Sequence, residues 1–157
     1  MFESLPDIPR LFTALAEWGA ALVYVFVVAR SASSNALNPN AAIPRWRLAA
    51  AAGGGLAVLA DAQELLGRAP LPLWVPGMMT AYALVWCVIR VGTALDWRWV
   101  THMSARAFIV AELAASLAWQ VVVYSHADKP FWHPTSLLVY TAISATCLAV
   151  VYYFERR

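Results

Sequence analysis

Four ionisable residues lie inside long apolar stretches of this sequence, and their positions make them the best candidates for chemistry. They are Glu17, Asp61, Arg90 and Glu112. An ionised side chain at the depth of a lipid bilayer costs about 2.5 to 3.5 kcal/mol even on a lenient scale, so such residues point to a structural or functional purpose. Glu64 lies nearer the end of the stretch that holds Asp61. We take all five residues as a predicted ligand- or ion-binding set.

These residues could bind or pass a proton, a cation or a small amphiphilic ligand that carries an amine. The set holds four acids and one arginine, and this excess of acid favours function over simple charge pairing. Removal from water favours the protonated form of a carboxyl group, which would suit proton exchange near neutral pH.

Helical spacing predicts that these charges point into a bundle. Asp61 shares a face with Gly54 and Glu64, and small residues on that face suit close helix packing. Arg90 and Glu112 fall at similar depth on helices joined by a short loop, so we expect them to form an ion pair. Asp61 is then left without a basic partner.

The alternative is that the charges only pair and hydrogen-bond to fix the register of the helices. Buried ion pairs often serve specificity of packing rather than chemistry. Glu64 and Arg68 are four residues apart and could form no more than a pair at the membrane interface.

A second group of candidates follows the fourth apolar stretch. His126, Asp128 and His133 lie in the segment YSHADKPFWHP, and with Asp61 or Glu64 they could form a metal site. Their spacing matches no known metal signature, so this group is the weaker one. Such a site would be consistent with an alternative function, an intramembrane enzyme that acts on a lipid-like substrate at the outer face. The sequence as a whole favours a protein that is not an enzyme.

The sequence lacks the residues that would bind retinal or a bis-histidine haem inside a membrane. The only lysine, Lys129, lies in a predicted loop, so no retinal Schiff base is expected in a helix. No two histidines share a depth inside the apolar stretches, which argues against a bis-histidine haem. The glycines at 53–55 lie within a predicted helix, where they indicate close packing or a bend rather than phosphate binding. No other cofactor is indicated.

Composition places the chain in a membrane. Of its 157 residues, 62% are hydrophobic and 13% are charged, about half the charged share of a soluble domain. A soluble domain of this length could not bury so much apolar surface, so lipid is the expected partner. The net charge of +2 and the scattered basic residues do not indicate nucleic-acid binding.

The apolar stretches predict an all-α, polytopic transmembrane bundle that forms one integral membrane domain over residues 1–157. Helices are expected because lipid offers no hydrogen-bond partner for free backbone groups. Five stretches are each long enough to cross a bilayer core of about 30 Å. Their expected bounds are 11–29, 48–67, 73–95, 105–124 and 137–154. The first stretch is expected to be a retained span rather than a cleaved signal.

The distribution of basic residues predicts the orientation, because cytoplasmic loops are enriched in lysine and arginine. One side holds seven such residues, namely Arg30, Arg45, Arg47, Arg98, Arg106, Arg156 and Arg157. The other side holds three, namely Arg10, Arg68 and Lys129. We therefore expect the N-terminus outside and the C-terminus in the cytoplasm.

The sequence predicts a small protein of a bacterial inner membrane that binds or conducts a proton, a cation or an amphiphilic ligand. Five helices are few for a full alternating-access transporter, which usually needs two repeats. We therefore expect a homo-oligomer or an accessory subunit of a larger membrane complex. A purely structural membrane subunit is the remaining alternative. No motif in the chain is specific enough to indicate a family.

Overall fold

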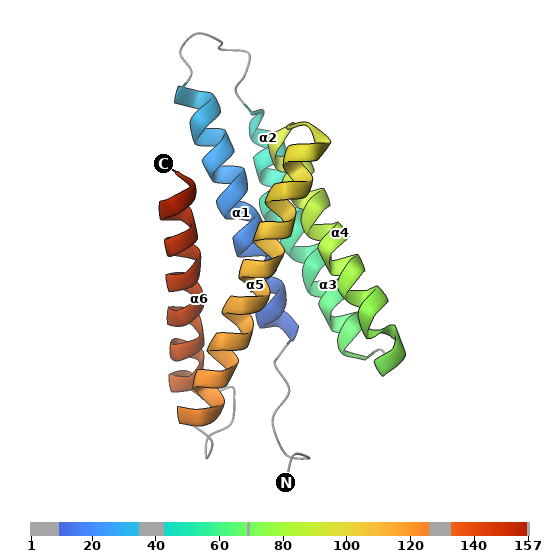
Figure 1. The fold of residues 1–157 in the computed structure, drawn as a ribbon, viewed down its shortest axis with the longest axis vertical. Helices are drawn as coiled ribbons and strands as arrows, with labels where there is room; N and C mark the ends of the chain where they lie inside the picture. Colours follow the sequence, from blue (N-terminus) through green and yellow to red (C-terminus); the bar gives the residue numbers. More distant parts are fainter. Residues whose placement is uncertain (1–9, 35–42, 69, 126–132, 157) are drawn as a thin grey trace.

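In the computed structural model, the described residues 10–34, 43–68, 70–125 and 133–156 form helices and no strand. The elements in chain order are α1 (Arg10–Ser34), α2 (Arg45–Ala49), the π-helical η2 (Ala50–Gly54), α3 (Gly55–Gly67), the 3-10 helix η3 (Leu71–Leu73), α4 (Trp74–Thr93), α5 (Trp97–Ser125) and α6 (Pro134–Glu155). The helices run back and forth along one axis, and α1 packs against α3, α4, α5 and α6 (Figure 1). The prediction of an all-helical fold is confirmed.

Four helices are long and apolar enough to cross a membrane. They are Arg10–Ala32, Trp74–Thr93, Trp97–Ser125 and Pro134–Glu155. The span expected at 48–67 is divided among α2, η2 and α3, and none of these is long enough alone. The backbone nevertheless stays helical at both junctions, with φ −64° and ψ −43° at Ala50 and φ −61° and ψ −43° at Gly55. The result is one interrupted helical rod beside four continuous helices.

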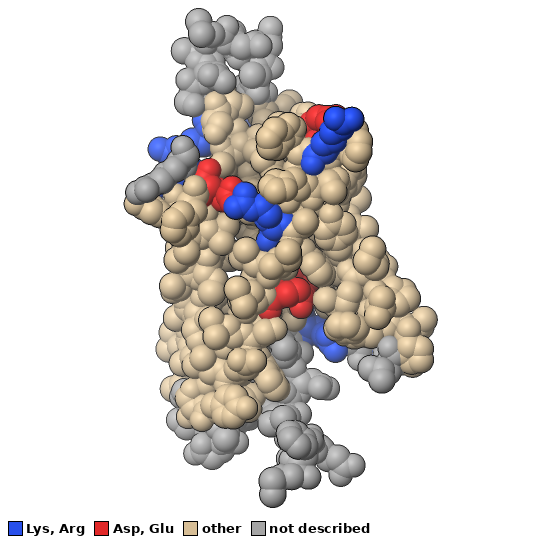
Figure 2. Space-filling model, viewed as in Figure 1, with Lys and Arg blue, Asp and Glu red and all other residues tan. Residues whose placement is uncertain are grey.

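The outer surface carries many large apolar side chains. The exposed ones include Phe26 and Leu65, and Leu113 and Leu138 are more than 60% exposed. Charged atoms cover little of the face seen in Figure 2. This is the surface that a helical protein presents to lipid, where apolar exposure costs nothing.

Helix α5 begins eight residues earlier than the sequence predicts. Asp96 caps its first turn, because its Oδ2 accepts a hydrogen bond from the backbone N–H of Arg98 at 3.4 Å. Thr101 and Ser104 lie inside the helix, where each donates its hydroxyl to a backbone carbonyl four residues earlier. Before this helix, Ala94 adopts a left-handed conformation with φ 55°, which ends α4.

Two glycines allow α1, α4 and the interrupted rod to approach closely. A Cβ at Gly92 would lie 2.7 Å from Cγ2 of Val25, and one at Gly55 would lie 2.9 Å from Cγ2 of Val88. The neighbouring Gly53 and Gly54 meet nothing within 4 Å. The expectation of close packing at these three glycines therefore holds at Gly55 only.

The π-helical turn is held by a side chain from α1. The indole N–H of Trp18 donates a hydrogen bond of 2.8 Å to the carbonyl of Ala52. A π-helical turn spaces its backbone hydrogen bonds more widely than an α-helix, and such turns often occur at functional sites. Trp18, which bonds to this turn, directly follows Glu17 in α1.

Candidate functional site

The centre of the bundle contains a buried acid, Glu17 of α1. Its side chain is 0% exposed, and its Oε1 accepts a hydrogen bond of 2.8 Å from Nε2 of Gln63 on α3. Gln63 is itself 1% exposed. The second oxygen of Glu17, Oε2, is buried and has no hydrogen-bond partner. A buried polar atom without a partner costs about 1 to 3 kcal/mol, so this oxygen marks a place where a ligand could bind.

Small side chains make room for this acid. Ala14, Ala16, Ala20 and Ala21 surround it along α1, and all four are buried. Alanine at helical spacing lets neighbouring backbones approach, as is common between helices in membranes. Glu17 therefore lies in a closely packed part of the core, away from bulk water.

A second acid, Glu112 of α5, lies near enough to interact electrostatically with Glu17. Glu112 is half-buried, and its Oε1 is also a buried oxygen without a hydrogen-bond partner. The positive charge of Arg10, at the start of α1, interacts electrostatically with Glu112. The site thus combines two acids from facing helices, one buried amide and one basic residue at its edge.

The expected ion pair between Arg90 and Glu112 does not form. The early start of α5 explains the error, because Glu112 lies fifteen residues, or about 22 Å, along α5 from Trp97. Arg90 lies only three residues from the end of α4, at the loop that joins the two helices. Its backbone carbonyl accepts a hydrogen bond of 3.3 Å from the guanidinium of Arg47.

Asp61 does not point into the bundle, so that expectation is also wrong. Asp61 is exposed, and so are Gly54 and Glu64 on the same face. The buried face of α3 instead carries Leu59 and Gln63. Glu64 pairs with Arg68 through a contact of 2.7 Å between exposed side chains, as the sequence predicts. Of the five predicted site residues, the structure brings together Glu17 and Glu112 alone.

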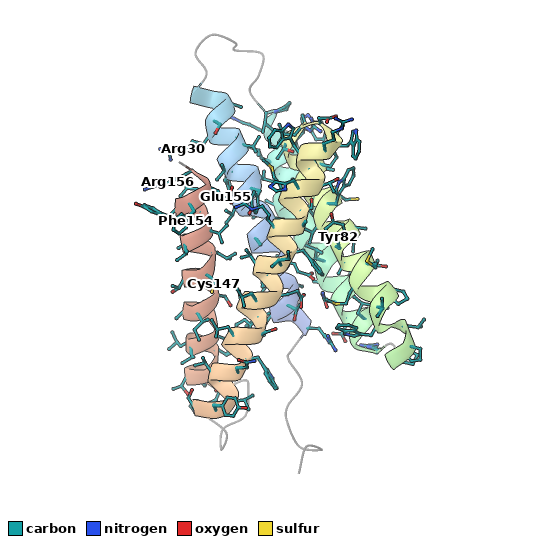
Figure 3. The ribbon with its side chains drawn as sticks, in the orientation of Figure 1. Arg30, Tyr82, Cys147, Phe154, Glu155 and Arg156 are labelled. Carbon is teal, nitrogen blue, oxygen red and sulfur yellow. The ribbon has the colours of Figure 1, made fainter. Side chains whose placement is uncertain are left out.

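Sequence reasoning missed an ion pair between Arg106 of α5 and Glu155 of α6. Glu155 also accepts a hydrogen bond of 3.4 Å from the hydroxyl of Tyr24 on α1. The three residues join the end of α6, where Figure 3 labels Glu155, to interior positions of α1 and α5. Arg106 and Glu155 are 49 positions apart, so no local spacing could have revealed them.

The second group of candidates is only partly visible. His126 and Asp128 lie outside the described residues. His133 caps α6, because its Nδ1 accepts the backbone N–H of Thr135 at 3.4 Å and lies 2.8 Å from that residue's Oγ1. Within the four described ranges, no three His, Cys, Asp or Glu residues gather as a metal site. Cys87 and Cys147 are free thiols.

No protein-family model, no curated protein and no solved structure matches this chain. The interpretation of the site therefore stands on its geometry.

Proposed function

We propose that this chain is an integral membrane protein that binds or conducts a proton or a small cation at Glu17 and Glu112. The observation that carries the proposal is the pair of buried oxygens without hydrogen-bond partners, Oε2 of Glu17 and Oε1 of Glu112. They come from α1 and α5, which pack along each other. Two acids within electrostatic reach of each other can each hold a proton or together attract a cation.

The charge balance around Glu17 supports this function. Gln63 donates a hydrogen bond but brings no positive charge. A carboxylate removed from water needs a cation or a proton to balance it. Among the residues that the structure describes, no basic side chain forms an ion pair with Glu17. A bound proton or a bound cation would supply the missing balance.

The site extends toward one end of the bundle at Arg10. Arg10 is the first residue of α1, and Glu112 interacts with it electrostatically. Glu17 lies about 10 Å further along α1. A proton or cation that arrives at Glu112 from this end would reach Glu17 next.

Infrared spectroscopy of the full-length chain in vesicles tests the proposal. A bound proton gives the carbonyl band of a neutral carboxylic acid, and this band should disappear in Glu17→Gln. Glu64→Gln is the matched control, because Glu64 is exposed and ion-paired with Arg68, so its replacement should leave the band unchanged. If a cation binds, adding sodium or potassium chloride should convert the band into that of a carboxylate. A band that survives Glu17→Gln, with no response to either salt, would show the proposal to be wrong.

The transport step has its own measurement. Vesicles that hold the wild-type chain should dissipate an imposed pH gradient faster than vesicles that hold Glu17→Gln or Glu112→Gln. Glu64→Gln should behave as the wild type does, because Glu64 is exposed and pairs with Arg68 at the end of α3. If the rates are unchanged in both glutamate variants, the protein binds the proton without conducting it.

We further propose five spans with the N-terminus outside, in a bacterial inner membrane. The interrupted rod of α2, η2 and α3 would be the fifth span. The start of α1 and the end of α6 lie at opposite ends of the bundle (Figure 1). Arg30, Arg47, Arg98 and Arg156 all belong to helix ends on the same side as the C-terminus. The positive-inside rule then places that side in the cytoplasm.

A role within a larger assembly is favoured by Asp61. An exposed acid at the expected depth of a span is costly unless a neighbouring chain covers it. We propose that a second copy or a partner subunit packs on this face of α3. Asp61→Asn should then reduce the size of the complex in native electrophoresis, whereas Glu64→Gln, at the end of the same helix, should not. Equal sizes for Asp61→Asn and the wild type would exclude this contact.

A further inference from the structure

A groove lies between α1 and α6 at the end of the bundle that holds the C-terminus. Its volume is about 540 Å³, and its lining residues are Val23, Phe26, Ala29, Arg30 and Tyr152. Figure 3 shows Arg30 and Arg156 on this side, near the ends of the two helices. The groove is far along α1 from Glu17, so it is separate from the site proposed above.

The mouth of this groove is basic. Arg30 lines it directly. The guanidinium of Arg156 lies 5.9 Å from the ring of Tyr152, which also lines the groove, and 5.0 Å from the ring of Tyr153. Glu155, which precedes Arg156 in the chain, is paired with Arg106.

The floor of the groove is apolar and lies deeper along the helix axis. Val23 is seven residues before Arg30, a distance of about 10 Å along α1. Phe26 lies between them and is 53% exposed. Basic groups at a helix end with apolar residues about 10 Å deeper match the layout of a phospholipid, whose phosphate lies at the interface and whose acyl chains lie in the core.

We propose that this groove binds an anionic phospholipid. Its phosphate would contact Arg30 and Arg156, and one acyl chain would lie against Val23 and Phe26. Basic pockets between transmembrane helices at the cytoplasmic side are suited to anionic headgroups, and each arginine near the surface contributes roughly a fivefold gain in affinity. A zwitterionic lipid offsets the attraction with its own positive group.

Native mass spectrometry of the full-length chain in a nonionic detergent tests this site. Phosphatidylglycerol should bind at least fivefold more tightly than phosphatidylcholine with the same acyl chains. The double variant Arg30→Gln with Arg156→Gln should weaken phosphatidylglycerol binding by roughly 25-fold. Arg68→Gln is the matched control, because Arg68 is an exposed arginine at the opposite end of the bundle, and it should have no effect.

A second variant tests the groove rather than its charge. Ala29→Trp keeps both arginines and fills the groove, so it should abolish tight lipid binding while the helix content measured by circular dichroism is unchanged. Three results would overturn the proposal. They are equal affinity for the two lipids, an equal loss in Arg68→Gln, and displacement of the lipid by inorganic phosphate, which would indicate a free-phosphate site.

Discussion

Gln63 of α3 donates its side-chain N–H to Glu17 of α1 over 2.8 Å, and both side chains are withdrawn from the surface. This bond and the one from the indole of Trp18 to the carbonyl of Ala52 both link the first helix to the interrupted rod. The bond from Gln63 gives Glu17 a donor without giving it a counter-charge. The stability of the bundle and the chemistry of the site therefore depend on the same pair.

Replacing Gln63 should destabilise the protein more than replacing Glu17 conservatively. In Gln63→Leu both oxygens of Glu17 lack a hydrogen-bond donor, which should cost about 1 to 3 kcal/mol of unfolding free energy. Glu17→Gln still offers an oxygen to Gln63, so its loss should be smaller. Thermal unfolding in detergent measures the difference. Gln120→Leu, at an exposed position of α5, is the control and should change stability by less than about 0.5 kcal/mol.

Substitution of Gly92 should disrupt the contact between α4 and α1. A Cβ there would lie 2.7 Å from Val25 and 3.2 Å from the Cβ of Ala51, so Gly92→Ala should cost about 1 to 3 kcal/mol through overpacking. Gly53→Ala meets no neighbour and should instead stabilise the helix by up to about 1 kcal/mol. Unfolding measurements that give the two variants the same sign would contradict the packing described here.

The Arg106–Glu155 pair should contribute only modestly to stability. The side chain of Arg106 is 49% exposed and that of Glu155 is 16% exposed, so solvent screens their attraction. A double-mutant cycle with alanine at both positions should give a coupling energy below about 1 kcal/mol. The cycle for Arg68 and Glu64, which are more exposed, should give about 0.3 to 0.5 kcal/mol. A coupling larger for the second pair would reverse the order expected from burial.

The interrupted rod should cross the membrane. Ser31→Cys introduces a single cysteine at the end of α1, before the chain enters the rod, and Arg68→Cys introduces one directly after the rod. Each would be made in a chain that also carries Cys87→Ala and Cys147→Ala. A maleimide that cannot cross the membrane should label position 31 from the cytoplasmic side and position 68 from the outside. Labelling of both positions from the same side would show that the rod lies on one surface and that the protein has four spans.

The fold class could be predicted because lipid imposes it. A chain with so much apolar surface and so few charges has few solutions other than a bundle of helices. The bounds of α5 could not be predicted as well. The stretch around Trp97 and Arg98 is too polar to be read as part of a span, yet Asp96 caps a helix there. That single error also misplaced Glu112 relative to Arg90.

The site could be predicted in part. Glu17 and Glu112 stand out because acids are rare in apolar stretches, and the structure places both in the interior. Asp61 stands out for the same reason, and yet it is exposed. The sequence offers two possible buried faces for α3, and small residues favoured the one that carries Asp61. In the structure the buried face is the one that carries Gln63, because its amide donates a hydrogen bond to Glu17 on a different helix. A contact between two helices of this kind has no local signature in the sequence.

The π-helical turn at Ala50–Gly54 contains one residue more than a regular α-helical turn. A deletion in an ordinary α-helix rotates everything beyond it by about 100°. A deletion within this turn would convert it to a regular helical turn, and Gln63 would keep its direction toward Glu17. Gly53 is the residue that can be removed, because a Cβ at this position would meet no neighbour within 4 Å. The alignment of Gln63 with Glu17 thus tolerates the loss of one residue within the π-helical turn. It does not tolerate such a loss between Gly55 and Gln63.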